Sequence, residues 1–497
     1  MSEYLHGAYG QTQAAGTQVS QKSERAIVYV GTAPVHTVEG GAQNVNKPIL
    51  VHNISEARKL LGYSDAWDKY TLCEAMKAHL ENKGVGPLVL INVLDPSKHK
   101  EAQGGTVSLV PENGRATVVN AEDAVLDSLV VKLTAVPETV KQKGVDYALR
   151  YDSKRQTITI AELSAGALGT ESLTITWDKI KPDAVTEAEL IGESDGEGLN
   201  TGLHAIKNVY QQTGYIPSHL LAPGFSSVPE VHAVMAQLTQ KVNGHWDVYM
   251  LADIPIVDKD SNPVTLQSAN TWKEANGYNR VNETVYFPLA KGTDGRIYHL
   301  SVLAAANFQE LLLAQDGIPY KTASNTDCPI IQNLYLGEDK QGRVYDDTMI
   351  NETLNKNGIA SAAFVGGRWA IWGAHSADYN QQNADQINVS ETSRMMLYYL
   401  SNDFQHRRTR DVDQPLSAND IKTIVSEEQT RLDALVKIGA LTFGEVHINA
   451  DEVARSDVYQ GDYSFTFRVT TTPLAKSMTA IVVWTPDGFA TYFADAA

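Results

Sequence analysis

The sequence predicts a mixed α/β protein with an inserted β-rich domain and a polar N-terminal segment. First, continuous apolar runs such as 25–34 (RAIVYVGTAP) and 88–94 (LVLINVL) alternate with amphipathic helical patterns, as in parallel sheets buried on both faces. Second, residues 96–185 hold short β-branched runs separated by Gly, Asp, Asn and Pro, which indicates a small sandwich or barrel. Third, residues 1–24 contain hardly any large aliphatic side chain and cannot bury enough surface to fold alone.

Between the first two apolar runs, the pattern predicts two helices. Ser55 is expected to open the first, which stops at Gly62. The second is expected over 69–82, where apolar side chains form one stripe.

An acidic linker closes the β-rich insert. Residues 182–200 carry six carboxylates and no basic residue. We expect a solvated hinge there.

Residues 202–330 return to an α/β pattern, which predicts parallel strand pairing with right-handed crossovers. The expected elements are strands around 218–224 and 246–255 and helices over 202–212, 228–242, 266–276 and 299–314.

A stretch with several glycines follows. Gly358 is placed to cap the end of a helix, and apolar runs at 359–365 and 369–372 flank the pair Gly366-Gly367. Two short buried strands around a glycine turn are predicted.

The remaining chain predicts two helices and then three strands. Ser417 is the expected cap of the second helix and Gly439 its stop. The helices are expected over 390–408 and 418–438, and the strands over 445–449, 463–471 and 479–485.

Composition limits the class of protein. A net charge of −18 argues against a general nucleic-acid or membrane-surface binder, and no apolar run reaches the length of about 18 residues that a membrane span needs. The N-terminus lacks the features of a secretory signal. Cys73 and Cys328 stand far apart outside any CxxC pair, which fits buried thiols in a reducing cytoplasm.

The residues available for hydrolytic chemistry form no recognisable motif. Asp253 follows a predicted strand, but Asp-Ile-Pro at a strand end is as readily a turn. His375 and Ser376 are sequence neighbours without a Gly-x-Ser-x-Gly elbow, and His245 has no motif around it. An α/β hydrolase with an unrecognised active site is therefore kept only as the alternative.

Metal and nucleotide motifs are absent from the sequence, and no cofactor is expected. Asp258-x-Asp260-x-Asn262 begins like a calcium loop, but Pro263 takes the position of the required Gly and Ala269 that of the required Glu. No GxxxxGK[ST] phosphate cradle occurs.

One basic cluster, His406, Arg407, Arg408 and Arg410, lies at the end of the helix expected over 390–408. Cations are favoured at a helix C-terminus by the helix dipole, at about 0.3–1 kcal/mol each. Contact with an acidic partner explains the cluster equally well.

The central motif resembles the centre of phage contractile-tail sheath subunits. It comprises Asn357-Gly-Ile, the pair Gly366-Gly367 and Ile371-Trp-Gly-Ala, in that order behind a helix. The family more often has Arg-Thr where this chain has His375-Ser376, so no role of that Arg is carried over.

Other motifs resemble the same family in the same order. Leu220-Leu-Ala-Pro-Gly followed by Leu251-Ala-Asp-Ile-Pro is similar to the sheath middle domain, which implies a subtilisin-like topology. His6-Gly-Ala-Tyr resembles the start of the sheath N-terminal arm without its proline. The resemblance covers roughly 1–95 and 200–497.

This resemblance implies a domain plan. It comprises an extended N-terminal arm (1–24), the first part of the core (25–95), an inserted β-rich domain with its linker (96–200), an α/β middle domain (201–374) and a C-terminal domain with a C-terminal arm (375–497).

The resemblance also implies function. It implies a non-enzymatic subunit that polymerises with itself as stacked hexameric rings around an inner tail tube and contracts without nucleotide hydrolysis to drive the tube through a bacterial envelope. Baseplate and tail terminator proteins are the other expected partners, with no nucleic acid and no membrane insertion. Assembly is expected in the host cytoplasm, either for a phage tail or for a tail-like injection particle. An adhesion protein that uses the β-rich insert is a further alternative.

Two groups of residues are expected at subunit contacts. The basic cluster is the candidate contact with the tube. The candidate inter-subunit arm residues are Tyr4, Tyr9, Phe465, Phe467, Val482, Trp484 and Phe489.

Overall fold

The computed structural model describes residues 24–134, 139–340, 342–380, 390–448 and 459–489. The chain divides after Pro415 into two compact units. The expected N-terminal arm, with Tyr4 and Tyr9, lies outside the described residues, except for Glu24.

An eight-stranded sheet organises the first unit, in the order β18-β17-β13-β12-β11-β1-β3-β2. The five pairings from β17 to β3 are parallel, as predicted, and the outer strands β18 and β2 pair antiparallel. The strands are β1 (Arg25–Gly31), β2 (Ile49–Val51), β3 (Leu88–Asn92), β11 (Ile216–Leu221), β12 (Tyr249–Asp253), β13 (Glu283–Tyr286), β17 (Ile359–Val365) and β18 (Arg368–Trp372).

Both faces of this sheet are buried, because successive side chains of a strand point to opposite sides. In β1, Ile27 and Tyr29 enter one apolar cluster, whereas Val28 and Val30 enter another. This explains why the strand sequences are continuously apolar rather than alternating.

Helices in the segments that connect the strands supply the side chains that cover the sheet. They are α1 (Ile54–Leu61), α2 (Leu72–Ala75), α4 (Val209–Thr213), α5 (Pro229–Leu238), α6 (Ala269–Ala275), α7 (Leu300–Ala314), α8 (Asp347–Thr353) and α9 (Glu391–Arg408). The expectation that Ser55 opens α1 is wrong: Asn53 is the cap, and its side chain accepts from the backbone N–H of Glu56. The helix expected over 69–82 starts at Leu72 and continues beyond α2 as a π-helical segment, Met76–Lys83.

A second, three-stranded sheet in this unit was not predicted. It consists of β14 (Leu289–Gly292), β15 (Ile297–His299) and β16 (Ile331–Tyr335).

The predicted glycine turn is present between β17 and β18. Gly366 and Gly367 have φ values of 58° and 81°, a left-handed conformation that glycine adopts without strain. The two strands pair antiparallel around this turn, as the sequence predicted.

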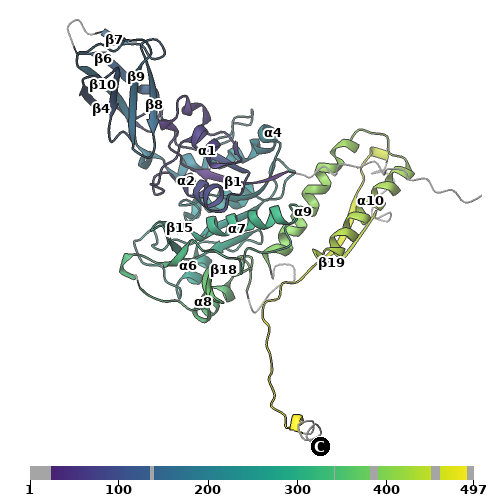
Figure 1. Cartoon of the computed structure of the whole chain (residues 1–497). Coiled ribbons are helices and arrows are strands. Elements are labelled where there is room, and N and C mark those ends of the chain that lie inside the picture. Colours follow the sequence, from purple (N-terminus) through teal and green to yellow (C-terminus); the bar gives the residue numbers. More distant parts are fainter. Residues whose placement is uncertain (1–23, 135–138, 341, 381–389, 449–458, 490–497) are drawn as a thin grey trace, which may run out of the picture. The chain divides into compact units, whose positions relative to one another are not determined.

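The insert is built from two small antiparallel sheets, seen in Figure 1 at the upper left. One has the order β4-β10-β6-β7 and the other β5-β9-β8, with a separate apolar core that includes Val131, Tyr147, Ile160 and Trp177. The strands are β4 (Lys100–Leu109), β5 (Arg115–Val118), β6 (Val130–Leu133), β7 (Thr139–Lys141), β8 (Tyr147–Asp152), β9 (Thr157–Glu162) and β10 (Leu173–Ile180).

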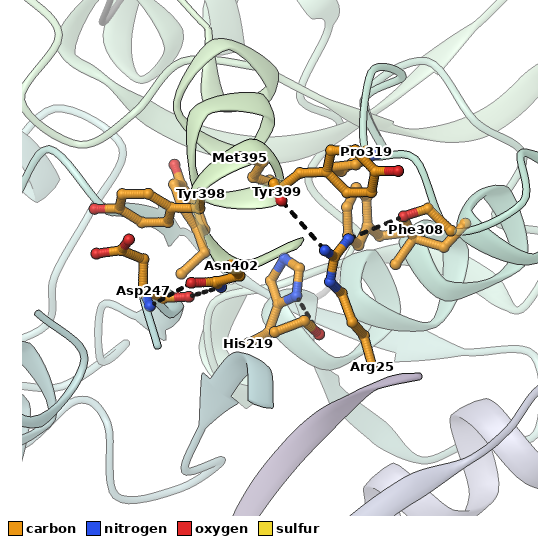
Figure 2. Close-up of a pocket in the computed structure, with 13 residues that line it drawn as sticks. Arg25, His219, Asp247, Phe308, Pro319, Met395, Tyr398, Tyr399 and Asn402 are labelled. Atoms are coloured by element: carbon orange, nitrogen blue, oxygen red, sulfur yellow. Dashed lines mark hydrogen bonds between the residues drawn. The ribbon is translucent and has the colours of Figure 1, made fainter. Parts of the chain in front are cut away.

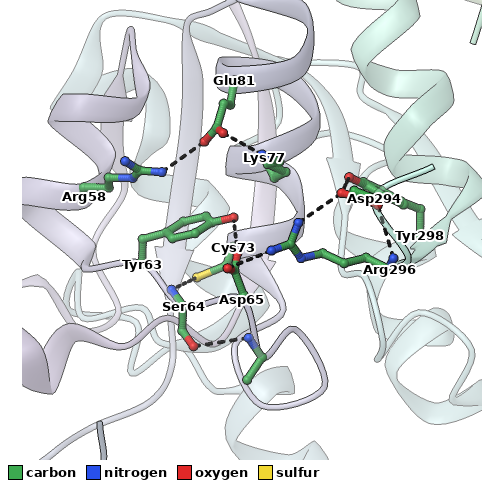
Figure 3. A network of polar contacts seen from close by, with 11 residues as sticks. Arg58, Tyr63, Ser64, Asp65, Cys73, Lys77, Glu81, Asp294, Arg296 and Tyr298 are labelled. Carbon is green, nitrogen blue, oxygen red and sulfur yellow. Dashed lines mark hydrogen bonds and ion pairs between the residues drawn. The ribbon is translucent and has the colours of Figure 1, made fainter. Parts of the chain in front are cut away.

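The insert meets the sheet domain around buried His36, which bonds the carbonyl oxygen of Glu122 at 2.9 Å and stacks on Tyr70. Beside this contact lies a polar cavity of about 350 Å³, lined from both sides. Figure 3 shows the ion pairs on its core side, where Glu81 binds both Arg58 and Lys77, at 3.0 and 2.5 Å.

The expectation of a solvated hinge over 182–200 is wrong for part of that segment. A short helix, α3 (Glu187–Ile191), forms behind a capping box made by Thr186 and Glu189. Its Leu190 is fully buried. The capping pattern fixes the start of this helix, and the apolar side chain fastens it to the core.

Candidate assembly surface

The second unit offers a small sheet supported by one helix. The helix α10 (Ala418–Lys437) starts at a capping box formed by Ser417 and Asp420, as the cap signal predicted. Gly439, with φ 78°, turns the chain into β19 (Leu441–Ile448). β19 begins four residues before the predicted strand, and β20 (Phe465–Thr471) pairs with it antiparallel.

The helix packs on one face of this hairpin. Leu432 and Leu435 are buried, as are Leu441 and Val446 of β19. A Cβ on Gly444 would lie 3.0 Å from the Cβ of Leu432, so glycine permits the close approach of helix and strand.

The opposite face of the hairpin is mostly polar. Glu445 and Arg468 stand opposite each other and form an ion pair at 3.7 Å. Phe443 is the exception, with 47% of its surface exposed.

The third predicted strand, over 479–485, does not form within this chain. Residues 472–485 have neither helical nor strand structure, and Figure 1 shows them running away from the hairpin. The side chains of Ile481, Val482 and Trp484 are 85%, 90% and 75% exposed. High β-propensity alone does not make a strand, because a strand needs a partner for its backbone hydrogen bonds.

The candidate arm residues therefore fall into two described groups. Phe465 and Phe467 lie half-buried in β20. Val482, Trp484 and Phe489 lie on the exposed C-terminal segment.

The basic cluster is not one open patch. In the first unit, Arg407 pairs with Asp403 at 3.0 Å and Arg408 with Asp411 at 3.2 Å. The His406 ring lies edge-on to Tyr210, with ring centres 6.4 Å apart. Arg410 is exposed and has no ion pair among the described residues. The spacing of Asp403 and Arg407, four residues apart on a helix, could have predicted the first pair.

The helix α9 that carries this cluster is anchored beside the first strand, as Figure 2 shows. The Arg25 guanidinium lies 4.2 Å from the centre of the Tyr399 ring and donates to the Tyr399 carbonyl at 3.3 Å. Further along α9, the Asn402 amide bonds both backbone groups of Asp247, at 2.8 and 2.9 Å. No sequence motif marked Arg25 or Asn402.

A small apolar cavity of about 30 Å³ lies between these anchors. His219 lines it, with its ring edge toward Phe308 at 4.7 Å between centres. Burial lowers the pKa of His219 to about 3, so the ring stays neutral. The cavity is too small for a substrate and belongs to the packing of α9.

The N-terminal end of α9 is held by a buried carboxylate. Glu391 accepts hydrogen bonds from the hydroxyls of Thr284 (3.0 Å) and Thr322 (2.5 Å). Burial raises the pKa of Glu391. The helix is thus held to the sheet domain near both of its ends.

The candidate hydrolytic residues each bind a different partner. Asp253 is buried and accepts hydrogen bonds from the hydroxyl and the N–H of Ser301, and burial raises its pKa. Ser376 donates to Asp378, His375 stacks on Tyr379 at 3.6 Å, and the His245 ring lies beside Trp246. These contacts make no nucleophile–base pair.

An ion pair and two thiols are further titratable groups in the first unit. His299 pairs with buried Glu74 at 2.7 Å, and this carboxylate raises the pKa of His299 to about 9 although burial opposes the charge. Cys73 and Cys328 are buried thiols whose pKa burial raises to about 12.

The described residues offer neither a metal site nor a membrane-spanning helix. No group of His, Cys, Asp or Glu side chains in this part of the chain could hold a metal ion. None of its helices combines the length and the apolar character that crossing a membrane requires.

Comparison with known proteins gives similarities at the level of sequence and of fold. No family model matches the chain. It is 29% identical over 243 residues to a tail sheath protein of Burkholderia phage BcepMu, a match that covers 48% of this chain and 47% of the relative. The chain thus spans about half the length of the curated relative it matches.

The fold matches solved structures over nearly the whole chain. A sheath complex of the extracellular contractile injection system PVC, in the contracted state, superposes with a TM-score of 0.53 at 10% identity, covering 98% of this chain and 99% of the other. A protein of the anti-feeding prophage baseplate gives 0.54 at 12% identity, covering 97% and 100%. The predicted resemblance to tail sheath proteins is confirmed.

Proposed function

We propose that the chain is a structural subunit of a contractile tail sheath. Copies stack as hexameric rings around an inner tail tube and contract to drive the tube through a bacterial envelope. The observation that carries the proposal is the fold shared with a contracted sheath protein over 98% of this chain, together with the sequence relationship to a phage tail sheath protein.

The proposed mechanism is mechanical. Subunits assemble in an extended, metastable packing, and a signal from the baseplate releases a contracted packing of lower free energy without nucleotide hydrolysis. The buried sheet domain, for which we propose the subtilisin-like topology of the family, moves as a rigid body. Tube, baseplate and tail terminator proteins are the other partners, and assembly takes place in the host cytoplasm.

Terminal arms connect the subunits while their bodies move. We assign this role to residues 1–24 and to the segment after β20, which includes Val482, Trp484 and Phe489. The exposure of these three side chains supports the assignment. Added strands gain about 0.5–1.5 kcal/mol per backbone hydrogen bond, and several bonds in every subunit hold a polymer together.

Negative-stain electron microscopy of the purified full chain tests the proposal. Rings or tubes are expected at high protein concentration, and a control truncated after Thr472 should remain discrete. A full chain that stays monomeric at all concentrations, alone and with an inner tube, would contradict the sheath proposal. It would favour the hydrolase or adhesion alternatives.

A further inference from the structure

The sequence contains four Asn-Gly pairs, and this dipeptide is the one most prone to spontaneous loss of ammonia. The pairs are Asn113-Gly114, Asn243-Gly244, Asn276-Gly277 and Asn357-Gly358. In the reaction, the backbone nitrogen of the glycine attacks the side-chain Cγ of the asparagine. Glycine permits this approach because it has no Cβ to hinder it. The side-chain amide and the glycine N–H must therefore be free to move toward each other.

Three of the four pairs have both reacting groups held by hydrogen bonds. The asparagine side chains donate to backbone carbonyls, Asn243 to Lys207 at 2.7 Å, Asn276 to Trp272 at 2.8 Å and Asn357 to Thr353 at 2.9 Å. The glycine N–H groups donate as well, Gly244 to Lys241 at 3.1 Å, Gly277 to Glu274 at 3.3 Å and Gly358 to Asn355 at 3.2 Å. Two hydrogen bonds must break in each of these pairs before attack.

The pair Asn113-Gly114 lacks both of these restraints. Within the described part of the chain, neither the Asn113 amide nor the Gly114 N–H has a hydrogen-bond partner, and Asn113 is exposed. The pair forms the two-residue turn before β5, closed by backbone hydrogen bonds of 2.8 and 3.1 Å between Glu112 and Arg115. The Glu162 N–H donates to the Gly114 carbonyl at 2.9 Å, which leaves the reacting nitrogen free.

Backbone conformation does not account for this difference. Asn113 and Gly114 have φ values of 50° and 72°, and Asn243 and Gly244 have values of 54° and 74°. Both asparagines are exposed. Because these two pairs share conformation and exposure, the two hydrogen bonds set them apart, and Asn243 serves as an internal control.

We propose that Asn113 is the site at which the folded chain loses ammonia, and that the product opens the turn before β5. The Gly114 nitrogen forms a new bond to Cγ of Asn113 and gives up its proton to solvent. The bond from Cγ to the side-chain nitrogen breaks, and this nitrogen leaves as ammonia. Water then hydrolyses the resulting succinimide at either carbonyl, which gives aspartate or isoaspartate. This inference does not depend on the proposed function.

The product changes both the length and the charge of the turn. Isoaspartate carries the main chain through its side-chain carboxyl group, so the backbone gains one methylene. A two-residue turn has no place for this extra atom, and the pairing of Glu112 with Arg115 should be lost. The new carboxylate also stands beside those of Glu112 and Glu162. A Cβ on Gly114 would lie 2.3 Å from Glu162 Oε1, which places the Glu162 carboxylate against the turn.

Peptide mass spectrometry of the full chain tests the assignment, after incubation in mildly alkaline buffer with and without guanidinium chloride. In the denaturant all four pairs are unfolded and should react at similar rates. Each hydrogen bond that must break first slows the attack about two- to tenfold. Relative to the rates in denaturant, Asn113 of the folded chain should therefore react at least about fourfold faster than Asn243, Asn276 or Asn357. A smaller ratio to any of the three would overturn the assignment.

Two variants separate the parts of the proposal. Asn113→Gly removes the reacting amide, and glycine adopts the left-handed conformation of this position without strain. It should abolish ammonia loss from this segment, and continued loss there would show that another residue reacts. Asn113→Asp has the charge of the product but not its extra methylene. The Arg115 amide should exchange hydrogen at least about twofold faster in the isoaspartate form than in Asn113→Asp. Equal exchange would show that the product does not open the turn.

Discussion

Three buried histidines make the fold sensitive to acid. Burial lowers the pKa of His36 and His79 to about 4 and that of His219 to about 3. Each ring is neutral in the folded chain but takes up a proton near pH 6.5 once unfolded. Their contribution to stability is therefore complete above pH 6.5, decreases as the pH falls from 6.5 toward the folded pKa values, and is fully lost below them.

We predict that the free energy of unfolding falls by about 1.4 kcal/mol per pH unit for each histidine between pH 6.5 and 4.5. His219→Phe should flatten this slope by about a third, because a phenyl ring can pack between Phe308 and Tyr249 without titrating. Urea unfolding at several pH values measures the slopes. Parallel curves for the two proteins would show that His219 does not contribute.

At the scale of elements, α9 depends on its anchors. Asn402 is buried, and its amide satisfies both the N–H and the carbonyl of Asp247. We predict that Asn402→Ala lowers the free energy of unfolding by about 1–3 kcal/mol, because it leaves these groups unsatisfied. Chemical denaturation measures the change. Gln405→Ala is the control, since among the residues that the structure describes its amide bonds only Ser401 of the same helix, and it should stay within about 0.5 kcal/mol.

Elements with local signals could be predicted from the sequence. Cap residues and stop glycines located α10, and the pair Gly366-Gly367 located the β17–β18 turn. The Thr186-x-x-Glu189 capping pattern was equally readable, but the acidic composition of 182–200 obscured the short helix behind it. The strand predicted over 479–485 is absent from the structure. Such an error cannot be avoided from the sequence, because β-propensity does not show whether a partner strand exists.

The candidate site was predictable only in part for the same reason. Its residue types are visible in the sequence, but their partners are not. Asn402 lies in a helix and carries no motif, and its role becomes visible only from its contact with Asp247. The basic cluster looked uniform, yet ion pairs with Asp403 and Asp411 separate Arg407 and Arg408 from the exposed Arg410.

At the scale of the whole molecule, Arg410 is the sharpest test of tube contact. We predict that Arg410→Glu leaves the free energy of unfolding within about 0.5 kcal/mol but weakens loading onto the tube, because charge reversal makes an attractive contact repulsive. Co-sedimentation with the inner tube protein measures loading. Arg407→Glu is a poorer probe, since it also breaks the pair with Asp403. Unchanged loading of Arg410→Glu would exclude this residue from the tube contact.

The insert should be dispensable for assembly, because its two sheets enclose their own core. The two segments that join the insert to the sheet domain lie side by side, because the Lys181 N–H donates to the His99 carbonyl at 2.8 Å. A short Gly-Ser bridge in place of 100–180 can therefore join them with little loop-closure cost. Loss of Val125 and Ile180, which pack in the main core, should cost about 2–4 kcal/mol. We predict soluble protein that still forms tubes in electron micrographs; folded protein that cannot assemble would place a subunit contact on the insert.

The two ends of the chain should be needed for assembly but not for folding. Truncation at Phe489 leaves α10, β19 and β20 intact, since this residue lies well beyond β20 and is 59% exposed. Residues 1–20 precede β1, and the main sheet starts at Arg25. We therefore predict that chains lacking 1–20 or 489–497 melt within a few degrees of the full chain.

Assembly should respond differently, because each proposed arm would supply backbone hydrogen bonds to a neighbouring subunit. Removing 1–20 should abolish tubes, and removing 489–497 should shorten or abolish them. Electron microscopy together with a thermal melt on the same samples separates lost assembly from lost folding. Long, regular sheaths from the chain lacking 1–20 would show that the N-terminal segment does not link subunits. The C-terminal segment would then have to connect the subunits without it.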